Sequence, residues 1–103
     1  MRLRLESARS YVLRAAWEYS HDPDFNPELS WGARVLGAEM AMDVTQTAML
    51  LFGGRGIMAD HPVEKYVRDA LTLTHGNGTD ALMTLRLGTH QAEARLAARG
   101  PGR

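Results

Sequence analysis

The chain has 103 residues, of which 45% are hydrophobic, which suits a single core of about three or four helices and argues against a second domain. Twelve Lys and Arg residues balance twelve Asp and Glu residues, so no net field attracts the chain to nucleic acid or to an anionic membrane. Cysteine is absent from the sequence, which excludes disulfides, thiolate nucleophiles and cysteine-based zinc sites.

The first predicted helix covers residues 3–20. Its apolar residues recur at steps of three and four, which places them on one face: Leu5, Ala8, Val12, Ala15 and Tyr19. The opening residues lack the apolar run of a secretory signal, and no segment approaches the roughly 18 apolar residues of a membrane span. We therefore expect a cytoplasmic protein with no membrane partner.

The second predicted helix covers residues 28–52. Residues 21–27 combine two prolines with side chains that favour turns, so they form the loop before it. Gly53-Gly54 supplies the residue type that ends helices. At about 1.5 Å per residue this helix is about 37 Å long, comparable with or longer than the width of a compact domain of this size. We expect something outside the chain to cover its ends.

Two further helices are predicted. One runs from Pro62 to about Leu73, with Glu64 spaced to pair with Arg68. Thr79 is placed to cap the other, whose predicted apolar face consists of Leu82, Leu85, Thr89, Ala92 and Leu96. With no alternating strand pattern, the fold class is all-α, a four-helix up-down bundle over residues 1–98 with a disordered tail at 99–103.

The candidate binding segments are two glycine-rich joints, 52–56 and 76–79. Glycine admits positive φ, so successive N–H groups can turn toward an anion such as phosphate, and a helix N-terminus adds a favourable dipole. Each joint taken alone is more simply a helix C-cap or a tight turn, and neither has the lysine of a P-loop or the strand context of a dinucleotide fingerprint. Arg55 is the cation expected to meet a phosphate at the first joint.

Four short motifs follow one another along the chain: Phe52-Gly53-Gly54-Arg55-Gly56-Ile57, Pro62-Val63-Glu64, Arg68-Asp69-Ala70 and Gly76-Asn77-Gly78-Thr79. Their order and spacing resemble the C-terminal helical domain of the acyl-CoA dehydrogenase family. In that family a long helix ends in an aromatic residue or His before Gly-Gly-x-Gly, and Pro-Val-Glu, Arg-Asp-Ala and a Glu-Gly-Thr loop follow. The resemblance extends from about Ala15 to about His90 and implies that domain's four-helix bundle.

The resemblance implies FAD-dependent α,β-dehydrogenation of an acyl thioester, either acyl-CoA or an acyl-carrier thioester. A carboxylate removes the α-proton while the β-hydrogen passes as hydride to FAD. By position, the residues that the resemblance assigns to the cofactor are Phe52, Gly53, Gly54, Thr79, Asp80 and Ala81, and the residue that it assigns to the substrate is Gly78. Both joints are accordingly expected beside flavin. The family's Gly-Gly loop typically contacts the FAD of a neighbouring subunit, so the resemblance implies an FAD shared with a partner subunit.

Three departures from the family pattern bear on function. Asn77 stands where many members carry the catalytic Glu, and a neutral amide cannot act as a general base near pH 7, so no catalytic residue is assigned. Leu50 stands where a Gln is often a nucleotide contact, which puts cofactor affinity in doubt. The family's enzymes are several times longer, with an N-terminal helical domain and a middle β domain.

Two functional interpretations follow. In the first, the chain is a C-terminal domain or split subunit of an FAD-dependent acyl-CoA dehydrogenase-like oxidoreductase, inactive alone, in a homo-oligomer or in a hetero-oligomer with a chain that supplies the other domains. In the second, it is a catalytically silent helical oligomerisation or binding module derived from that family. No metal site is expected, because the four histidines lack a metal-ligand spacing: His21, His61, His75 and His90.

Overall fold

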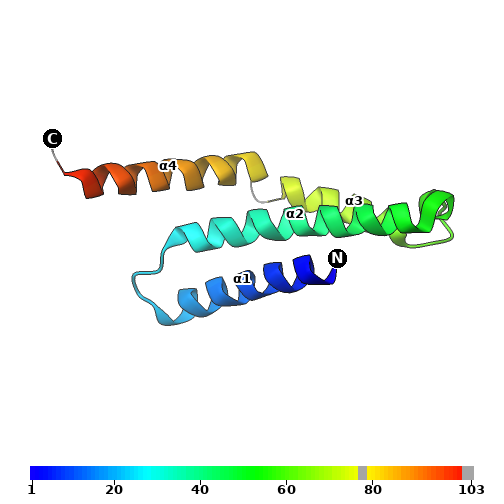
Figure 1. The fold of residues 1–103 in the computed structure, drawn as a ribbon, viewed down its shortest axis with the longest axis horizontal. Helices are drawn as coiled ribbons and strands as arrows, with labels where there is room; N and C mark the ends of the chain where they lie inside the picture. Colours follow the sequence, from blue (N-terminus) through cyan, green and yellow to red (C-terminus); the bar gives the residue numbers. More distant parts are fainter. Residues whose placement is uncertain (77–78, 101–103) are drawn as a thin grey trace.

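The computed structural model describes residues 1–76 and 79–100, which form helices joined by short turns (Figure 1). The elements in chain order are α1 (Arg2–His21), α2 (Pro27–Phe52), the 3-10 helix η1 (Gly53–Ile57), α3 (Val63–His75) and α4 (Asp80–Arg99). Within these residues there is no β-strand. The all-α class and its four helices are therefore confirmed.

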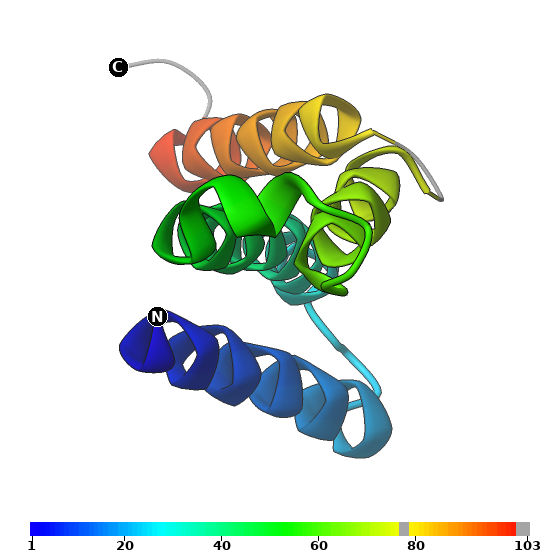
Figure 2. The same cartoon turned by 90° about the vertical axis from the view of Figure 1, so that its right-hand side faces the viewer.

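The helices lie in three layers, with α2 in the middle (Figures 1 and 2). α1 runs antiparallel to α2 on one side, α4 lies on the opposite side, and α3 lies beside α2 at about the same level (Figure 2). This arrangement arises because α3 has 13 residues and α2 has 26, so α3 covers only the C-terminal part of α2 and leaves the N-terminal part to α4. α4 continues in the direction of α3 and extends past the start of α2.

The helix ends follow from their capping residues. The Asn26 Oδ1 atom accepts a hydrogen bond from the Glu28 N–H at 2.9 Å, and Pro27 occupies the first position of α2. α2 thus begins one residue before the predicted start. Pro62 precedes α3 as its N-cap, and α3 continues to His75, two residues beyond the predicted end. Arg99 belongs to α4, so that part of the predicted tail is helical, whereas residues 101–103 lie outside the described part of the chain.

Small residues bring α1 and α2 close together. Ala8 and Ala15 are buried against α2, with 1% and 6% of their surface exposed. Gly32 leaves room for Tyr11 at this contact, because a Cβ there would lie 2.6 Å from the Tyr11 hydroxyl oxygen and the Tyr11 side chain would have to shift. The predicted face of α1 is only partly correct, because the three larger residues of that face, Leu5, Val12 and Tyr19, are exposed.

We expect Gly32→Ala to change the free energy of unfolding by less than about 1 kcal/mol, because the Tyr11 side chain can shift and the helix gains from alanine. The new methyl group collides with the far end of the Tyr11 side chain. In a Tyr11→Phe background, which lacks the hydroxyl, the same substitution is expected to cost less. Urea unfolding of the four variants in a double-mutant cycle measures the coupling. A coupling energy of zero contradicts this packing.

The orientation of α4 differs from the prediction. The predicted face is exposed at its large residues, Leu82, Leu85 and Leu96. α4 instead turns its other regularly spaced face toward α2: Asp80, Met83, Leu87 and His90. A polar anchor accounts for this, since His90 Nδ1 lies 2.9 Å from Glu28 Oε1 and its ring meets Trp31 edge-on at 5.8 Å. Both faces have helical spacing, so periodicity alone did not distinguish them.

The molecule is elongated, with dimensions of 62 × 28 × 23 Å and a radius of gyration of 17.7 Å. A compact domain of this length has a radius of gyration of about 13 Å. The three-layer arrangement therefore leaves much of each helix in contact with solvent. Within the described residues, no helix is both long enough and apolar enough to cross a bilayer.

Candidate functional site

The first glycine joint is a compact turn at one end of the molecule (Figure 1). α2 ends at Phe52, and Gly53 caps it with φ 57° and ψ −142°, in a region that favours glycine. The chain then forms η1, a 3-10 helix that the sequence pattern did not predict. The N–H of Met58 donates to the Arg55 carbonyl at 3.2 Å and closes this turn.

The three glycines of this joint have different roles. Gly53 provides the positive φ. Gly56 is buried against α2, and a Cβ there would lie 2.8 Å from the Met49 carbonyl oxygen. A Cβ at Gly54, by contrast, would meet nothing within 4 Å. The backbone conformation therefore explains Gly53, and close packing on α2 explains Gly56. At Gly54 the position that a Cβ would occupy is open to an outside group.

The tip around this joint is apolar and exposed. The Phe52 ring lies edge-on to His61 at 5.6 Å, and about half of its surface remains accessible. Arg55 is exposed on η1. The other large exposed side chains here are Leu50, Leu51, Ile57 and Met58. An exposed aromatic ring, open backbone at Gly54 and one guanidinium form a surface suited to a ligand that combines a flat ring with phosphate.

The second joint is tied to α2 by a residue that sequence reasoning did not identify. Arg34 Nη2 donates to the Leu73 carbonyl at 3.0 Å and also to the Gly76 carbonyl, so it caps the C-terminal end of α3. The sequence feature that could have identified Arg34 is its charge, which lies in the middle of a largely apolar helix. Asn77 and Gly78, the predicted base position and substrate contact, lie outside the described residues.

The residues after this joint open α4. Thr79 Oγ1 accepts a hydrogen bond from the Leu82 N–H at 3.2 Å, which confirms the predicted cap. Asp80 is half-buried in the first helical turn, and its Oδ1 is buried without a hydrogen-bond partner in the part of the chain that the structure describes. Ala81 is exposed beside a shallow hollow along α4. The start of α4 thus presents one buried carboxylate oxygen and one small side chain.

We expect Thr79→Ala to reduce the free energy of unfolding by about 1 kcal/mol, because the Leu82 N–H loses its partner at the helix start. Thr79→Ser keeps the hydroxyl and is expected to retain most of this stability. Thermal unfolding followed by circular dichroism compares the two variants. Equal losses from both would contradict a capping role and would indicate that the Thr79 methyl group matters instead.

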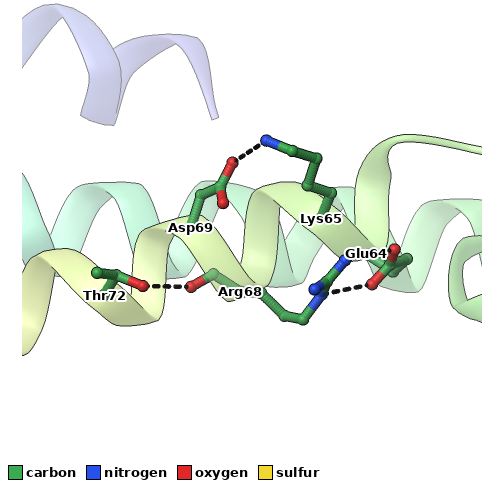
Figure 3. A network of polar contacts seen from close by, with 5 residues as sticks. All are labelled: Glu64, Lys65, Arg68, Asp69 and Thr72. Carbon is green, nitrogen blue, oxygen red and sulfur yellow. Dashed lines mark hydrogen bonds and ion pairs between the residues drawn. The ribbon is translucent and has the colours of Figure 1, made fainter.

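α3 separates the two joints as a rigid spacer. Its 13 residues span about 20 Å at the usual rise. Two ion pairs run along its surface, Glu64 with Arg68 at 2.8 Å and Lys65 with Asp69 at 2.6 Å (Figure 3). The hydrogen bond that Arg68 donates to Glu64 raises the pKa of Arg68, and the one that Lys65 donates to Asp69 raises the pKa of Lys65. The predicted Glu64–Arg68 pair is confirmed, and its role is structural.

The described residues offer limited means for chemistry of their own. Among residues 1–76 and 79–100, no three His, Asp or Glu side chains come together as a metal centre requires. His61 contacts Phe52, His90 contacts Glu28, and His21 stacks on Trp17 at 4.6 Å. The candidate site thus consists of two joints at the two ends of α3, which is about 20 Å long.

Comparison with known proteins gives one consistent result. The family model described as acyl-CoA dehydrogenase, C-terminal domain, matches residues 1–92. The short-chain specific acyl-CoA dehydrogenase of Clostridium acetobutylicum is 36% identical over 85 residues, which cover 82% of this chain and 22% of that protein. The butyryl-CoA dehydrogenase structure from Megasphaera elsdenii superposes with a TM-score of 0.83 at 28% identity, over 89% of this chain and 24% of that one. The chain thus spans less than a quarter of the length of these relatives.

Proposed function

Because the chain belongs to the acyl-CoA dehydrogenase family, as its C-terminal helical domain, we propose that it supplies the flavin-facing turn and bundle surface of an FAD-dependent dehydrogenase of acyl thioesters. A chain that carries the N-terminal and middle domains would complete this assembly, which we place in the cytoplasm. The observation that carries the proposal is the exposed apolar tip at Phe52, where the backbone at Gly54 is open although glycine there serves no packing within the chain.

The residues of the tip fit an FAD edge. Phe52 offers an exposed ring for contact with a flat heterocycle, and Gly53 sets the turn that presents it. Open space at Gly54 allows backbone to approach the cofactor closely. The Arg55 guanidinium suits a phosphate oxygen. Leu50 adds an apolar contact in place of an amide, so we expect this edge to bind by shape and stacking more than by hydrogen bonds.

The second joint would serve a different part of the assembly. Thr79, Asp80 and Ala81 are proposed to contact cofactor, and Gly78 the thioester of an acyl-CoA or acyl-carrier substrate. Since α3 holds the joints about 20 Å apart, they would contact different parts of one extended FAD or two FAD molecules. Arg34 would position this joint from α2 through its bonds to the Leu73 and Gly76 carbonyls.

The chain alone is proposed to be inactive. When bound, FAD supplies the acceptor for the β-hydrogen, which passes as hydride. The chain's own residues would orient the cofactor edge and the thioester, but Asn77 has no basic atom to remove the α-proton. Position 77 would therefore supply no base for proton removal in the assembly.

A second candidate function is a catalytically silent oligomerisation or binding module. Asn77 and Leu50 favour it, because each replaces a polar family residue by one that lacks its chemistry. The exposed apolar residues along the helices also favour it. In this case the bundle surface would be retained for assembly while the flavin contacts have no function.

The test is reconstitution with a chain that carries the two other domains, co-expressed with this one. We expect a complex in chromatography that retains FAD, read from its visible absorbance, whereas neither chain alone retains it. A complex without flavin at saturating FAD would support the silent module. Failure of the two chains to associate would contradict both functions.

A further inference from the structure

The second joint is short, and both of its ends are anchored. α3 ends at His75 and leads into Gly76, and Thr79 is the N-cap of α4. The end of α3 and the start of α4 both lie beside the middle of α2 (Figure 1). Two residues separate Gly76 from Thr79, so their Cα atoms are at most about 11 Å apart. The contacts that hold Gly76 and Thr79 therefore limit where the joint can lie.

The anchor at Thr79 belongs to α4 itself. Thr79 Oγ1 accepts a hydrogen bond from the Leu82 N–H at 3.2 Å, and the Thr79 carbonyl accepts one from the Met83 N–H at 3.1 Å. The Met83 side chain is buried, and farther along α4 the His90 ring is bonded to Glu28 of α2 at 2.9 Å. These contacts hold the start of α4 without involving α3.

The anchor at Gly76 comes from another helix. Within α3, the Gly76 N–H donates to the Thr72 carbonyl at 3.1 Å. The Gly76 carbonyl, which leads into the joint, accepts a hydrogen bond from Arg34 Nη2 on α2, and the same nitrogen donates to the Leu73 carbonyl at 3.0 Å. Carbonyls in the last turn of a helix lack partners within that helix, and the partly negative helix end attracts a cation. Arg34 therefore stabilises the end of α3 and fixes the direction in which the chain leaves it.

We infer that Arg34 is a positioning residue for the second joint and that it sets the affinity of the assembly for the acyl thioester. The inference rests on the proposed function, in which Gly78 contacts the thioester. Arg34 acts through the Gly76 carbonyl, two residues before Gly78. A joint that is held in place before the thioester arrives needs less ordering when the thioester binds, and preorganisation of this kind raises affinity.

The affinity for FAD is expected to be independent of Arg34. The proposed FAD contacts lie at the tip around Phe52 and at the start of α4. The tip lies beyond the opposite end of α3, which is about 20 Å long, and the start of α4 has its own anchors in Thr79 and Met83. Loss of the Arg34 bonds should therefore weaken thioester binding and leave FAD binding unchanged. A residue with a merely structural role in the bundle would affect both affinities or neither.

The test uses the assembly reconstituted with a chain that carries the N-terminal and middle domains. Dissociation constants are measured for FAD and for acetyl-CoA, a thioester that binds without dehydrogenation because its acyl group has no β-carbon. Arg34→Met removes both bonds and is expected to raise the dissociation constant of acetyl-CoA by about tenfold or more, with that of FAD unchanged. Arg34→Lys should stay within about threefold of the wild-type assembly, because both bonds come from one nitrogen and an ammonium group also has donors and charge.

The matched control is Lys65→Met, which removes one positive charge from the surface of α3, where Lys65 pairs with Asp69. It should leave both dissociation constants unchanged. Circular dichroism follows the fold of each variant. If Arg34→Met does not fold, Arg34→Gln repeats the test, because the glutamine side chain is too short to reach both carbonyls.

The outcomes separate this inference from the proposed function. A wild-type assembly that does not bind acetyl-CoA contradicts the thioester contact of the proposed function and, with it, this inference. An assembly that binds both ligands, with equal acetyl-CoA affinity for wild type and Arg34→Met, overturns the inference alone. Equal weakening of FAD and acetyl-CoA binding by Arg34→Met also overturns it, because this result assigns Arg34 a structural role.

Discussion

Asn77→Glu, introduced into the assembly reconstituted with a chain that carries the N-terminal and middle domains, is expected to raise the rate of acyl-thioester dehydrogenation by about 10²- to 10⁴-fold. This is the range that a positioned general base contributes to proton transfer. The amide of Asn77 has no such capacity, and in the family pattern a glutamate occupies the corresponding position. Single-turnover reduction of bound FAD by an acyl-CoA, followed by absorbance, gives the rate directly.

The control for this prediction is Asn77→Gln, which has the length of glutamate without its charge and is expected to leave the rate unchanged. An equal rate for the glutamate and glutamine variants, in assemblies that both retain FAD, would contradict a base position at residue 77. It would instead favour the silent module, or a base supplied by the completing chain.

The second large effect is expected at the tip, where Gly56→Val should lower the free energy of unfolding by about 1–3 kcal/mol. A Cβ at Gly56 approaches the Met49 carbonyl oxygen at 2.8 Å, and backbone cannot move aside as a flexible side chain does. Gly53→Ala should cost about 1–3 kcal/mol for a different reason, because its φ of 57° is strained for other residues.

Gly54→Ala is the matched control at the tip, since its side is open, and a change within about 0.5 kcal/mol is expected. Urea unfolding of the three single variants compares them under one set of conditions. Three equal losses would mean that the turn tolerates no side chain anywhere. No loss at Gly56 would contradict the close contact between η1 and α2.

The helices themselves were largely predictable from the sequence because local signals determine where they begin and end. Asn26 and Pro27 begin α2, Gly53 ends it, and Thr79 begins α4. These caps act within a few residues, so their effect can be predicted without knowledge of the rest of the fold. The 3-10 helix η1 was missed, because its glycines have low helix propensity and it forms through packing on α2.

The packing of the helices was less predictable because it depends on contacts between distant residues. In α4 two faces share the helical spacing, and the contact of His90 with Glu28 and Trp31 selects the one that faces α2. In α1 the small residues Ala8 and Ala15 are buried while larger neighbours stay exposed. Hydrophobicity does not indicate which apolar residues remain uncovered in a chain that leaves its middle helix partly exposed.

In the candidate site, too, local features were predictable from the sequence and contacts between distant residues were not. The sequence identified both glycine joints, but it did not distinguish Gly53 and Gly56, which the fold requires, from Gly54, which it does not. It also predicted that both joints lie beside flavin, and this stays a prediction, with α3, about 20 Å long, between the two joints. Arg34 was not assigned, since its bonds to the end of α3 join residues 39 and 42 positions away.

The proposed contact of the turn at Phe52–Gly54 with FAD is tested most directly by the dissociation constant of FAD from the reconstituted assembly. Gly54→Leu fills space that is open in the chain alone, so it should leave the fold intact and raise this dissociation constant by about tenfold or more. Gly88→Leu, which adds the same side chain on α4, should leave the constant unchanged. An unchanged FAD affinity in the Gly54→Leu assembly would contradict the account.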